Sequence, residues 1–378
     1  MARPARARYP CGERNDRGTE MGVWHIMPDH ELGGGGVMIA RLLQAFAEIG
    51  ETEGHEALLP VNADPRMREV FAGLPHRIGA FPGRGSPVAM AADILRHARP
   101  GDVAHAHGSR AAMAASLARL RRPSLTVIYT VHGFHGLAQP GPLGLRRRIE
   151  RLLARRVDGT AFVSHEDKAL AAEHGLRHRG PAEVIENGMK VPAPAPGEAR
   201  DIDVLFVGRM VYQKWPQAFV ETVAALRRRD GRAPKAVMIG AGEMAGEIDA
   251  LAAGLGLENF TRHDGLASPE TLAMMGRARV LAMTSRWEGL PTVAIEAAMA
   301  GALVTGFDIP PLRGVLGPDA DALLTPADPA ALAARIGALL ADDAAREALA
   351  GPLQARTLER FAPERMARRY RALYDAAA

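Results

Sequence analysis

Apolar segments of strand length alternate with segments of helical spacing along most of this chain. Residues 23–27 form the first apolar segment, the polar loop PDHELGGGG follows, and Met38, Leu42, Ala45 and Ile49 then recur at helical intervals. Further strands are predicted before residue 190, at residues 103–106, 126–130, 160–163 and 183–185. Strands that alternate with helices in this way predict βαβ units, and therefore parallel sheets with helices on both faces.

The alternation is interrupted at residues 191–200, whose sequence VPAPAPGEAR has no apolar period and is typical of a linker. Beyond it, strands are predicted at residues 204–207, 236–239, 259–262, 280–283 and 302–305. The chain is therefore expected to be an α/β protein with two Rossmann-like, doubly wound domains, residues 22–190 and 201–360. Such folds bind ligands at the carboxyl ends of their strands, so the expected site is an interdomain cleft.

Length and composition agree with two globular domains. The chain has 378 residues, of which 47% are hydrophobic and 24% charged. No apolar run approaches about 18 residues, so no membrane-spanning helix is predicted. Residues 1–21 are basic and polar, which favours a disordered leader over a secretory signal peptide. Cys11 is the only cysteine, which excludes a disulfide framework and a cysteine-based metal site and is typical of a cytoplasmic protein.

The stretch that points most strongly to chemistry is SRWEGLPTVAIEAAMAG, residues 285–301. Pro291 is placed early in a helix and Gly301 just after its end, so a helix is predicted from about residue 291 to residue 300. Glu288 then lies in the loop before the helix, and Glu296 lies more than one turn inside it. The backbone N–H groups of residues 289–292 are expected to be free there and to suit a diphosphate. Either glutamate alone is typical of a solvated surface, but the two together can accept hydrogen bonds from sugar and ribose hydroxyls.

A second stretch, VLFVGRMVYQKW, covers residues 204–215. A buried strand leads into Gly208 and Arg209, and Lys214 follows five residues later. Arginine offers a planar fork to phosphate oxygens, and lysine offers a mobile point charge. Because this pair lies in the same predicted domain as the two glutamates, it is a candidate for neutralising a pyrophosphate and stabilising it as it leaves.

Together with VIENGMK, YTVHGFHG and the PDHELGGGG loop, these stretches resemble the retaining glycosyltransferase family 4, which has the GT-B fold of two Rossmann-like domains. The resemblance covers about residues 22–345, and its most specific parts are the Glu-x7-Glu helix and the Arg-x4-Lys strand end. It implies that a C-terminal helix, residues 363–376, packs back on the first domain. One departure is Trp215, where family members commonly have a glycine.

The resemblance implies roles for single residues. Glu288 and His132 would contact the transferred sugar, Glu296 would bind the ribose hydroxyls, and Arg209 and Lys214 would hold the diphosphate. The other residues expected to line the donor, including a loop at 33–36 that closes over the diphosphate, are Gly34, Gly35, Gly36, Gly208, Gly289, Leu290, Pro291 and Thr292. Retention would proceed by front-face attack, with the leaving diphosphate helping to take the acceptor's proton. No nucleophilic carboxylate, metal or other cofactor is therefore expected.

The same resemblance indicates substrates and location. The donor would be a UDP-sugar, and the acceptor a glycan or a lipid-linked oligosaccharide of cell-envelope, lipopolysaccharide or exopolysaccharide biosynthesis. The enzyme would work in the cytoplasm, either free or peripherally at the inner face of the cell membrane. Two alternatives stay open, namely another GT-B activity such as a sugar-nucleotide epimerase, and a non-catalytic nucleotide-sugar-binding scaffold protein.

Residues 145–157 predict an amphipathic helix with a basic face. Leu145, Ile149, Leu152, Leu153 and Val157 form one stripe. The rest of the helix surface is basic, with Arg146, Arg147, Arg148, Arg151, Arg155 and Arg156. One interpretation is a surface helix with a solvated basic face; the other is a patch that rests on anionic lipid, where each basic residue contributes about 1 kcal/mol. Nucleic acid is not an expected partner, because only 5% of residues are aromatic.

Histidines supply two further alternatives in the first domain. His132 follows a predicted strand in YTVHGFHG, and His135 competes with it three residues later. His105 and His107 alternate in AHAHG, which is a spacing that suits metal ligands, but the sequence shows no third ligand.

Short acidic and glycine patterns occur in the second domain. The Asp-x-Asp strings at residues 201–203 and 319–321 match the metal-binding pattern of GT-A transferases, but strings this short arise by chance. Gly240, Gly242 and Gly246 follow a predicted strand and resemble a dinucleotide fingerprint, although the third glycine is one position late. An NAD(P) enzyme is therefore a minor alternative.

Overall fold

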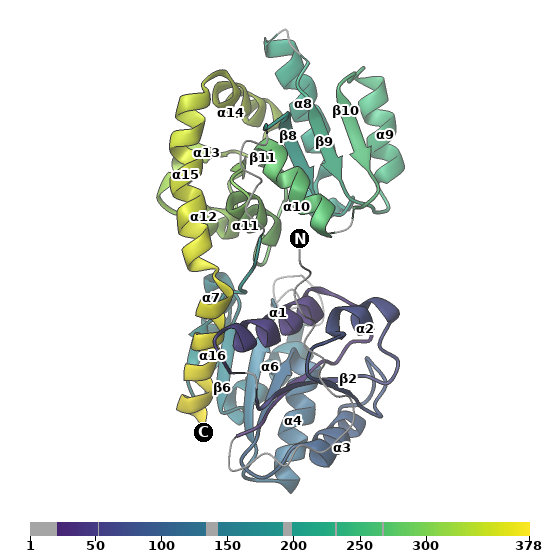
Figure 1. Ribbon diagram of the computed structural model, residues 1–378, viewed down its shortest axis with the longest axis vertical. Coiled ribbons are helices and arrows are strands. Elements are labelled where there is room, and N and C mark those ends of the chain that lie inside the picture. The colour runs from purple at the N-terminus through teal and green to yellow at the C-terminus, as the bar shows by residue number, and fades with distance from the viewer. Residues whose placement is uncertain (1–20, 52, 134–142, 192–198, 231–232, 267) are drawn as a thin grey trace, which may run out of the picture. The chain divides into compact units, whose positions relative to one another are not determined.

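The computed structural model describes residues 21–51, 53–133, 143–191, 199–230, 233–266 and 268–378 (Figure 1). The chain divides into two compact units: unit 1 is residues 1–188 with 363–378, and unit 2 is residues 189–362. The division after residue 188 lies three residues before the predicted linker at 191–200. Residues 1–20 of the predicted leader, with Cys11, lie outside the described residues, as does His135.

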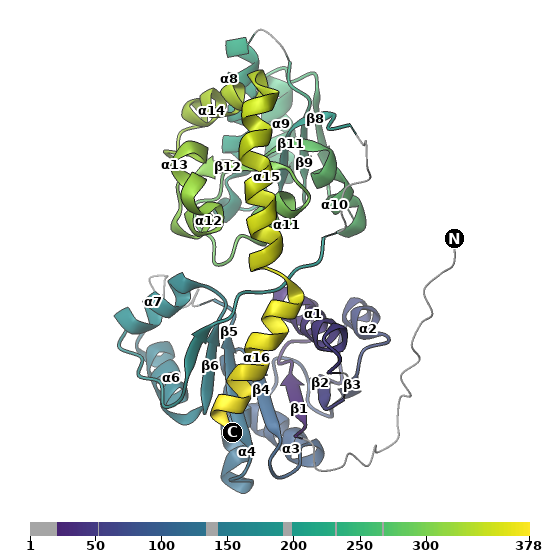
Figure 2. The same ribbon diagram turned by 60° about the vertical axis from the view of Figure 1, so that its left-hand side comes forward.

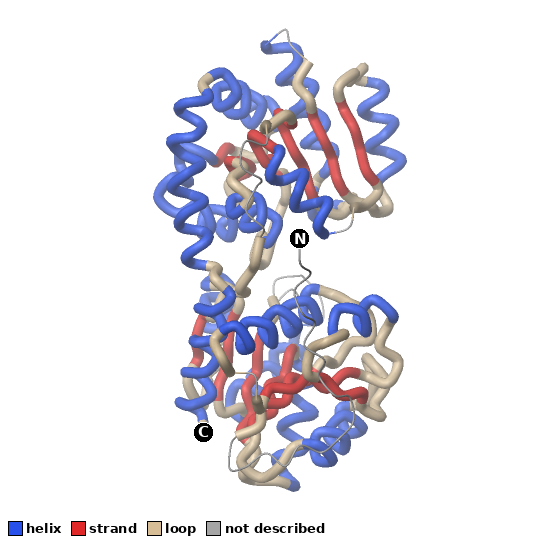
Figure 3. Tube along the Cα trace, viewed as in Figure 1, coloured by secondary structure: helices blue, strands red, loops and turns tan. Residues whose placement is uncertain are grey.

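Unit 1 is built on a parallel sheet whose described strands have the order β3-β2-β1-β4-β5-β6-β7. The strands are β1 (Val23–Ile26), β2 (His55–Leu59), β3 (His76–Ile78), β4 (Val103–His107), β5 (Thr126–Val131), β6 (Gly159–Phe162) and β7 (Ala182–Val184). Five of them are buried at every position, as expected of a parallel sheet covered on both faces (Figure 3).

Helices cover both faces of this sheet. They are α1 (Gly34–Glu48), α2 (Pro65–Phe71), α3 (Pro87–His97), α4 (Ser109–Arg121), α6 (Leu143–Arg156), α7 (His165–Glu173) and α16 (Pro363–Ala377). On one face α1 and α16 pack together over the strands and bury Phe46, Tyr370 and Tyr374 (Figure 2). On the other face α3, α4 and α6 pack on Trp24, Ile26 and neighbouring strand residues. The C-terminal helix is thus an integral part of the unit 1 core.

Unit 2 has a second parallel sheet, in the order β10-β9-β8-β11-β12-β13. Its strands are β8 (Ile202–Val207), β9 (Ala236–Ile239), β10 (Phe260–His263), β11 (Ala278–Met283), β12 (Leu303–Phe307) and β13 (Leu324–Thr325). Its helices are α8 (Pro216–Asp230), α9 (Ala245–Gly254), α10 (Ser268–Arg277), α11 (Thr292–Met299), α12 (Pro310–Leu316), α13 (Ala320–Leu323), α14 (Pro329–Ala341) and α15 (Asp343–Arg360), with the short 3-10 turns η1 (Tyr212–Lys214) and η2 (Gly317–Asp319). These elements enclose one continuous apolar core.

Three strands were not predicted from the sequence. β2 begins with His55 and Glu56, which are buried although polar, and Glu56 is paired with Arg77 Nε of β3 at 2.8 Å. β3 is three residues long with only one aliphatic side chain, and β13 has two residues. Each of these segments is too short or too polar to show an apolar period in the sequence. They are strands because they pair with neighbouring strands in the folded sheet.

The predicted apolar stripe of residues 145–157 is wrong in part. Leu153 and Val157 are buried, whereas Leu145 is 68% exposed and Leu152 is 52% exposed. The helix therefore meets the core only along its C-terminal half and presents two leucines to solvent among its arginines. Within the described residues, no helix is both long enough and apolar enough to cross a membrane.

Glu150, on the same helix, gives unit 1 a pH-dependent stability. The Tyr129 hydroxyl donates to its carboxylate oxygens at 3.1 and 3.4 Å, and burial raises the pKa of Glu150 to about 7. The folded state therefore holds this proton more tightly than the unfolded state, so the free energy of unfolding falls as the pH rises from 4.5 to about 7.

We expect Glu150→Gln to raise the free energy of unfolding at pH 8 by about 1–3 kcal/mol, because the variant no longer buries a carboxylate. At pH 4.5 or below the difference should nearly vanish. Urea unfolding at the two pH values measures both. Glu69→Gln, at an exposed position of α2, is the control, and an equal gain in that variant would contradict the assignment.

Candidate functional site

The chain order of the strands in unit 2 reverses between β8 and β11, which are neighbours in the sheet. Ligands of open parallel sheets bind where such a reversal separates the loops at the carboxyl ends of the strands. The loop after β8 carries Gly208, Arg209 and Lys214, and the loop after β11 carries Glu288. The structure therefore brings the two stretches singled out in the sequence to one edge of one sheet.

Lys214 and Glu288 form an ion pair at this edge. Lys214 Nζ lies 2.5 Å from Glu288 Oε1, and the side chains are only 16% and 6% exposed. Ser285 Oγ donates to the same carboxylate oxygen at 2.6 Å. Ser285 has no role in the sequence interpretation, although it lies three residues before Glu288 in the same motif. Glu288 is thus held in one position by two donors before any ligand binds.

Arg209 has a different environment. It is exposed, and it has no hydrogen bond or ion pair from its side chain to any other residue in the described part of the chain. Neighbouring Gly208 is packed closely, since a Cβ there would lie 3.3 Å from Phe206 Cζ, and it would also contact Lys214 Cδ at 3.5 Å. One fixed and one uncommitted cation therefore lie on the same short loop.

The two loops are fastened to each other through backbone and aromatic contacts. Arg286 N donates to Gln213 O at 2.8 Å, and Gln213 Nε2 donates to Trp287 O at 3.0 Å. The Arg286 guanidinium lies 3.8 Å from the ring centroid of Trp215 and 4.4 Å from that of Tyr212. These contacts fix the relative positions of the lysine and the glutamate.

Trp215 adopts a left-handed backbone conformation, with φ of 45°. Glycine reaches this region without strain, which accounts physically for the glycine that commonly stands here in the resembling family. In this chain the ring packs on Phe307, with centroids 5.4 Å apart, and on Arg286. The tryptophan thus replaces a conformationally free glycine with a side chain that packs against two neighbours.

Helix α11 begins at Thr292, with Pro291 as its N-cap, and ends beside Gly301, whose φ is 84°. The prediction that the amide of Thr292 is free is wrong, because it donates to Leu290 O at 2.9 Å; Pro291 has no N–H to offer. For Gly289 and Leu290, the described residues provide no partner for the amide. The anion-binding potential of this helix start is therefore limited to those two groups and the positive end of the helix dipole.

Glu296 lies on α11 one turn beyond Thr292 and is half-buried. It therefore projects from the same helix whose N-terminus follows Glu288. The helix packs in the unit 2 core through Ala294, Ala297 and Ala298, and its Ile295 and Met299 are buried in a smaller apolar cluster.

The glycine turn after β9 has a packing role. A Cβ on Gly240 would lie 1.9 Å from Gly208 O, and one on Gly242 would lie 2.4 Å from Met210 O. Met210 N donates to Ala241 O at 2.9 Å, so the turn lies directly against the Arg209 loop. These close approaches explain the two glycines without a dinucleotide.

The aspartates of both Asp-x-Asp strings are paired with basic residues. Asp201 accepts from Arg277 Nη2 at 2.7 Å and from Lys235 Nζ at 2.5 Å, and these hydrogen bonds hold the pKa of Asp201 below its usual range. Asp203 accepts from the amide of Lys235 at 2.9 Å. In the second string, Asp319 pairs with Arg356 and Asp321 with Arg313. Asp201 and Asp203 also lie at the start of β8, away from the edge that carries Lys214.

In unit 1 the corresponding reversal falls between β1 and β4. The predicted loop at 33–36 is not a loop throughout: Gly33 is the N-cap, and Gly34, Gly35 and Gly36 form the first turn of α1. This turn has neither an acidic residue nor a side-chain cap, so its amides face outward with the positive end of the helix dipole. A Cβ on Gly35 would lie 3.9 Å from His132 Cδ2, which makes the glycine turn and His132 neighbours.

His132 follows β5 and is half-buried. Its Nε2 lies 3.0 Å from His107 Nδ1, and burial lowers its pKa to about 4. The imidazole is therefore neutral at physiological pH and offers one lone pair or one N–H to a ligand.

In the folded structure a third histidine, His25, lies beside His105 and His107, which the sequence did not reveal. The nearest ring nitrogens of His25, His105 and His107 lie within 4.8 Å of one another, a grouping that a metal could use. Both nitrogens of His105 already have ordinary partners, however: Thr130 Oγ1 at 2.7 Å and the Tyr374 hydroxyl at 2.8 Å. We therefore interpret the cluster as a hydrogen-bonded network.

Comparison with known families matches both units. The family profile described as "Glycosyl transferases group 1" matches residues 194–351, and the profile described as "Glycosyl transferase 4-like domain" matches residues 33–188. A 2-deoxystreptamine glucosyltransferase of Streptomyces kanamyceticus is 28% identical over 355 residues, which cover 82% of this chain and 90% of that protein.

Solved structures share the fold. HepE of Anabaena, in complex with UDP and glucose, aligns with a TM-score of 0.76 at 16% identity over 93% of this chain and 99% of that one. Sucrose-phosphate synthase of Thermosynechococcus elongatus aligns with a TM-score of 0.73 at 18% identity over 94% of this chain and 98% of that one. Both sheets of this chain therefore have counterparts in proteins of the same architecture.

Proposed function

The chain belongs to the group 1 glycosyltransferases with the GT-B fold, and we propose that it transfers a sugar from a UDP-sugar to an acceptor hydroxyl, with retention of configuration and without a metal. The observation that carries this proposal is the Lys214–Glu288 ion pair, 2.5 Å apart, which joins the loop after β11 to the loop after β8, where the uncommitted Arg209 also lies. It places two cations and a carboxylate at the reversal point of a nucleotide-binding type of sheet.

Charge neutralisation is the main task of these cations. As the bond between the sugar and the diphosphate breaks, negative charge grows on the leaving group. Arg209 would meet it with a bidentate fork and Lys214 with a point charge, helped by the amides of Gly289 and Leu290. This arrangement supplies the positive charge that a divalent cation supplies elsewhere, and each Asp-x-Asp string is already paired with basic side chains.

Glu288 and Glu296 would recognise hydroxyl groups of the donor. Glu288 has Oε1 engaged by Lys214 and Ser285, so its other oxygen is the one proposed to accept from the sugar. Glu296, one turn into α11, is proposed to bind the ribose. In unit 1, His132 is proposed to contact the transferred sugar, and the amides of Gly34, Gly35 and Gly36 to contribute to diphosphate binding.

The acceptor is proposed to be a glycan or a lipid-linked oligosaccharide of cell-envelope or exopolysaccharide biosynthesis. The test offers radiolabelled UDP-glucose, UDP-N-acetylglucosamine and UDP-galactose with three acceptors: an oligosaccharide, an alkyl glycoside that mimics a lipid-linked glycan, and 2-deoxystreptamine, for which the Streptomyces relative is named. The expected result is an α-linked product by NMR, formed equally with and without EDTA. A β-linked product, or loss of transfer in EDTA, would contradict the retaining, metal-independent mechanism.

Helix α6 is proposed to rest on an anionic lipid surface. Its arginines 146, 148, 151, 155 and 156 are exposed, and Leu145 and Leu152 protrude among them. Positive charge attracts anionic headgroups, and exposed leucines can enter the acyl boundary. Leu145 and Leu152, the two exposed members of the predicted apolar stripe, thus support the proposal.

Charge reversal tests this surface. We expect Arg148→Glu/Arg155→Glu to lower partitioning onto vesicles with phosphatidylglycerol at least 30-fold at low salt, since each lost basic residue removes about 1 kcal/mol. Arg365→Glu/Arg368→Glu, which reverses the same number of exposed charges on α16, is the matched control. Equal loss in both variants, or no sedimentation of the wild-type protein with vesicles, would contradict a specific lipid-facing helix.

A further inference from the structure

Four histidines form a diagonal series on one face of the unit 1 sheet. His55 of β2 is in register with Val23 of β1, and His25 lies two residues further along β1. His25 is in register with His105 of β4, and His107 lies two residues further along β4. His107 is in register with Thr130 of β5, and His132 lies two residues beyond it. Steps of two residues keep the side chains on one face of a sheet, so the series crosses from the start of β2 to the end of β5.

Each histidine is hydrogen-bonded to the next through its ring. His55 Nδ1 lies 3.3 Å from His25 Nε2, His25 Nδ1 lies 3.4 Å from His107 Nε2, and His107 Nδ1 lies 3.0 Å from His132 Nε2. The rings therefore share one orientation, with Nε2 toward His55 and Nδ1 toward His132. A uniform head-to-tail orientation is what proton exchange along imidazoles requires.

The rings of His25, His107 and His132 are neutral, because burial lowers the pKa of each, and this restricts where their protons can lie. His25, His55 and His107 are at most 4% exposed, and desolvation lowers the pKa of His25 and His107 well below the ordinary value. A neutral imidazole has one N–H donor and one lone pair. Each gap between rings needs one proton to be a hydrogen bond, so only two arrangements satisfy all three gaps: all four rings protonated on Nε2, or all four protonated on Nδ1.

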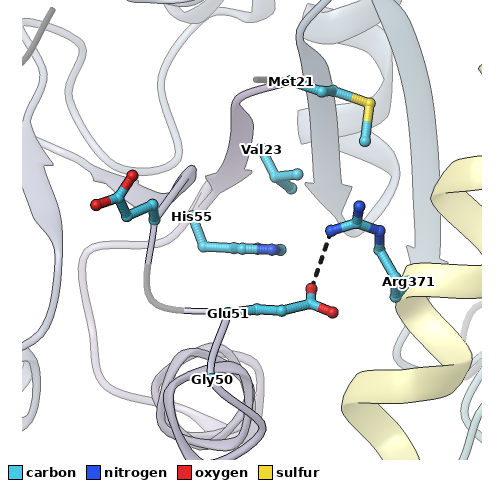
Figure 4. A pocket seen from close by; sticks show the side chains of 7 residues that line it. Met21, Val23, Gly50, Glu51, His55 and Arg371 are labelled. Carbon is cyan, nitrogen blue, oxygen red and sulfur yellow. Dashed lines mark hydrogen bonds and ion pairs between the residues drawn. The ribbon is translucent and has the colours of Figure 1, made fainter. Parts of the chain in front are cut away.

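The two ends of the series lie at different features of unit 1. His55 lines a pocket of about 600 Å³ together with Glu51, Glu53 and Arg371, and its ring points into that pocket beside the Glu51–Arg371 ion pair (Figure 4). At the other end, His132 lies beside Gly35 in the uncapped first turn of α1. The series thus connects a polar pocket at the start of β1 and β2 with a candidate ligand-contacting histidine at the end of β5.

We propose that His55, His25, His107 and His132 form a proton relay in which the pocket around Glu51 and Arg371 sets the tautomer of His132. When a proton enters at His55 Nε2, one proton moves across each of the three gaps and one leaves at His132 Nδ1. All four rings are neutral before and after, and the reverse transfer restores the first arrangement. His55, His25 and His107 act as positioning residues, because they decide whether His132 presents Nδ1–H as a donor or Nδ1 as an acceptor.

A histidine that donates at Nδ1 and one that accepts there favour different hydroxyl geometries. The use of the His132 tautomer in sugar recognition rests on the proposed function. The relay itself is a property of unit 1 and is testable without any sugar nucleotide. Failure of glycosyl transfer and failure of the relay are therefore separate outcomes.

Nitrogen-15 NMR of protein labelled in histidine tests the relay, because the shifts of the two ring nitrogens identify the tautomer. Signals are assigned by replacing one histidine at a time with glutamine. In the wild-type protein at pH 7.5 we expect all four rings to have the same tautomer or to exchange between the two together. Opposite tautomers in neighbouring rings, such as Nε2–H on His25 with Nδ1–H on His107, would overturn the proposal without any variant.

A substitution at the pocket end then tests transmission. In His55→Phe, which keeps a ring beside Phe46, we expect the His132 tautomer population to shift although two rings separate the positions. His178→Phe, at a unit 1 histidine bonded to Thr160 and outside the series, is the control and should leave His132 unchanged. An unchanged His132 spectrum in a folded His55→Phe protein would overturn the relay.

Discussion

Replacement of Arg209 by alanine is expected to weaken nucleoside diphosphate binding by about 10–100-fold, because hydrogen bonds to a charged group contribute about 1.5–3 kcal/mol. The rate of sugar transfer should fall further, by about 100–1000-fold, since the charge on the diphosphate is greatest in the transition state. Isothermal titration with UDP and initial-rate measurements give the two numbers. The unfolding midpoint should not change, because the Arg209 side chain is exposed and has no partner among the described residues.

Arg335→Ala is the matched control for that experiment. Arg335 lies on α14 in the same unit, in a half-exposed position. The Arg335→Ala substitution removes the same net charge as Arg209→Ala and leaves the proposed phosphate site unchanged. If Arg335→Ala weakened UDP binding as much as Arg209→Ala does, the effect would come from long-range charge, and the assignment of Arg209 would be wrong.

Removal of Lys214 is expected to affect both activity and stability. Lys214→Met leaves the Glu288 carboxylate, only 6% exposed, without its ion-pair partner. Breaking a buried pair in this way costs about 3 kcal/mol, whereas replacing both partners costs far less. We therefore expect Lys214→Met/Glu288→Gln to recover most of the free energy of unfolding while sugar transfer stays at least 100-fold below wild type.

The recovery in the double variant is the informative result. Urea unfolding of the wild type, the two single variants and the double variant gives the coupling energy between the two side chains. A coupling near zero would mean that the pair is not formed in solution. Full activity in the double variant would show that neither side chain serves the reaction.

The sequence alone predicted the parts of the fold that depend on local periodicity. The strand–helix alternation, the apolar strand 236–239 and the extent of α11 between Pro291 and Gly301 follow from spacing and from turn residues that act within one element. Two parallel sheets then follow, because this alternation has few compact solutions.

The features that the sequence did not reveal depend on how the chain is arranged in the folded protein, and not on a local apolar period. β2 begins with two polar residues and β3 has a single aliphatic side chain, so both are recognised as strands only when they pair in the folded sheet. The contact of Ser285 with Glu288 depends on the turn between them. The two exposed leucines of α6 follow the period of a buried stripe but lie beyond the edge of the core. A helical period shows which residues share a face, and only packing decides how much of that face is covered.

The histidine series illustrates the same division. The alternation of His105 and His107 placed both on one face of a strand, and this was visible in the sequence. That His25 lies opposite His105 depends on strand order and register, which place β1 between β2 and β4. The series therefore became visible only when the sheet was assembled.

The most direct test of the central claim is the thermal stability of the wild-type protein with UDP, GDP, ADP, dTDP and NAD(H), each with and without EDTA. At a concentration about 1000-fold above the dissociation constant, a ligand adds about 4 kcal/mol to the free energy of unfolding, which is a clear shift in midpoint. We predict that UDP raises the midpoint selectively, that EDTA does not change this, and that Arg209→Ala abolishes most of it. No response to any diphosphate, or a response to NAD(H) alone, would contradict a metal-independent nucleotide-sugar site at Arg209, Lys214 and Glu288.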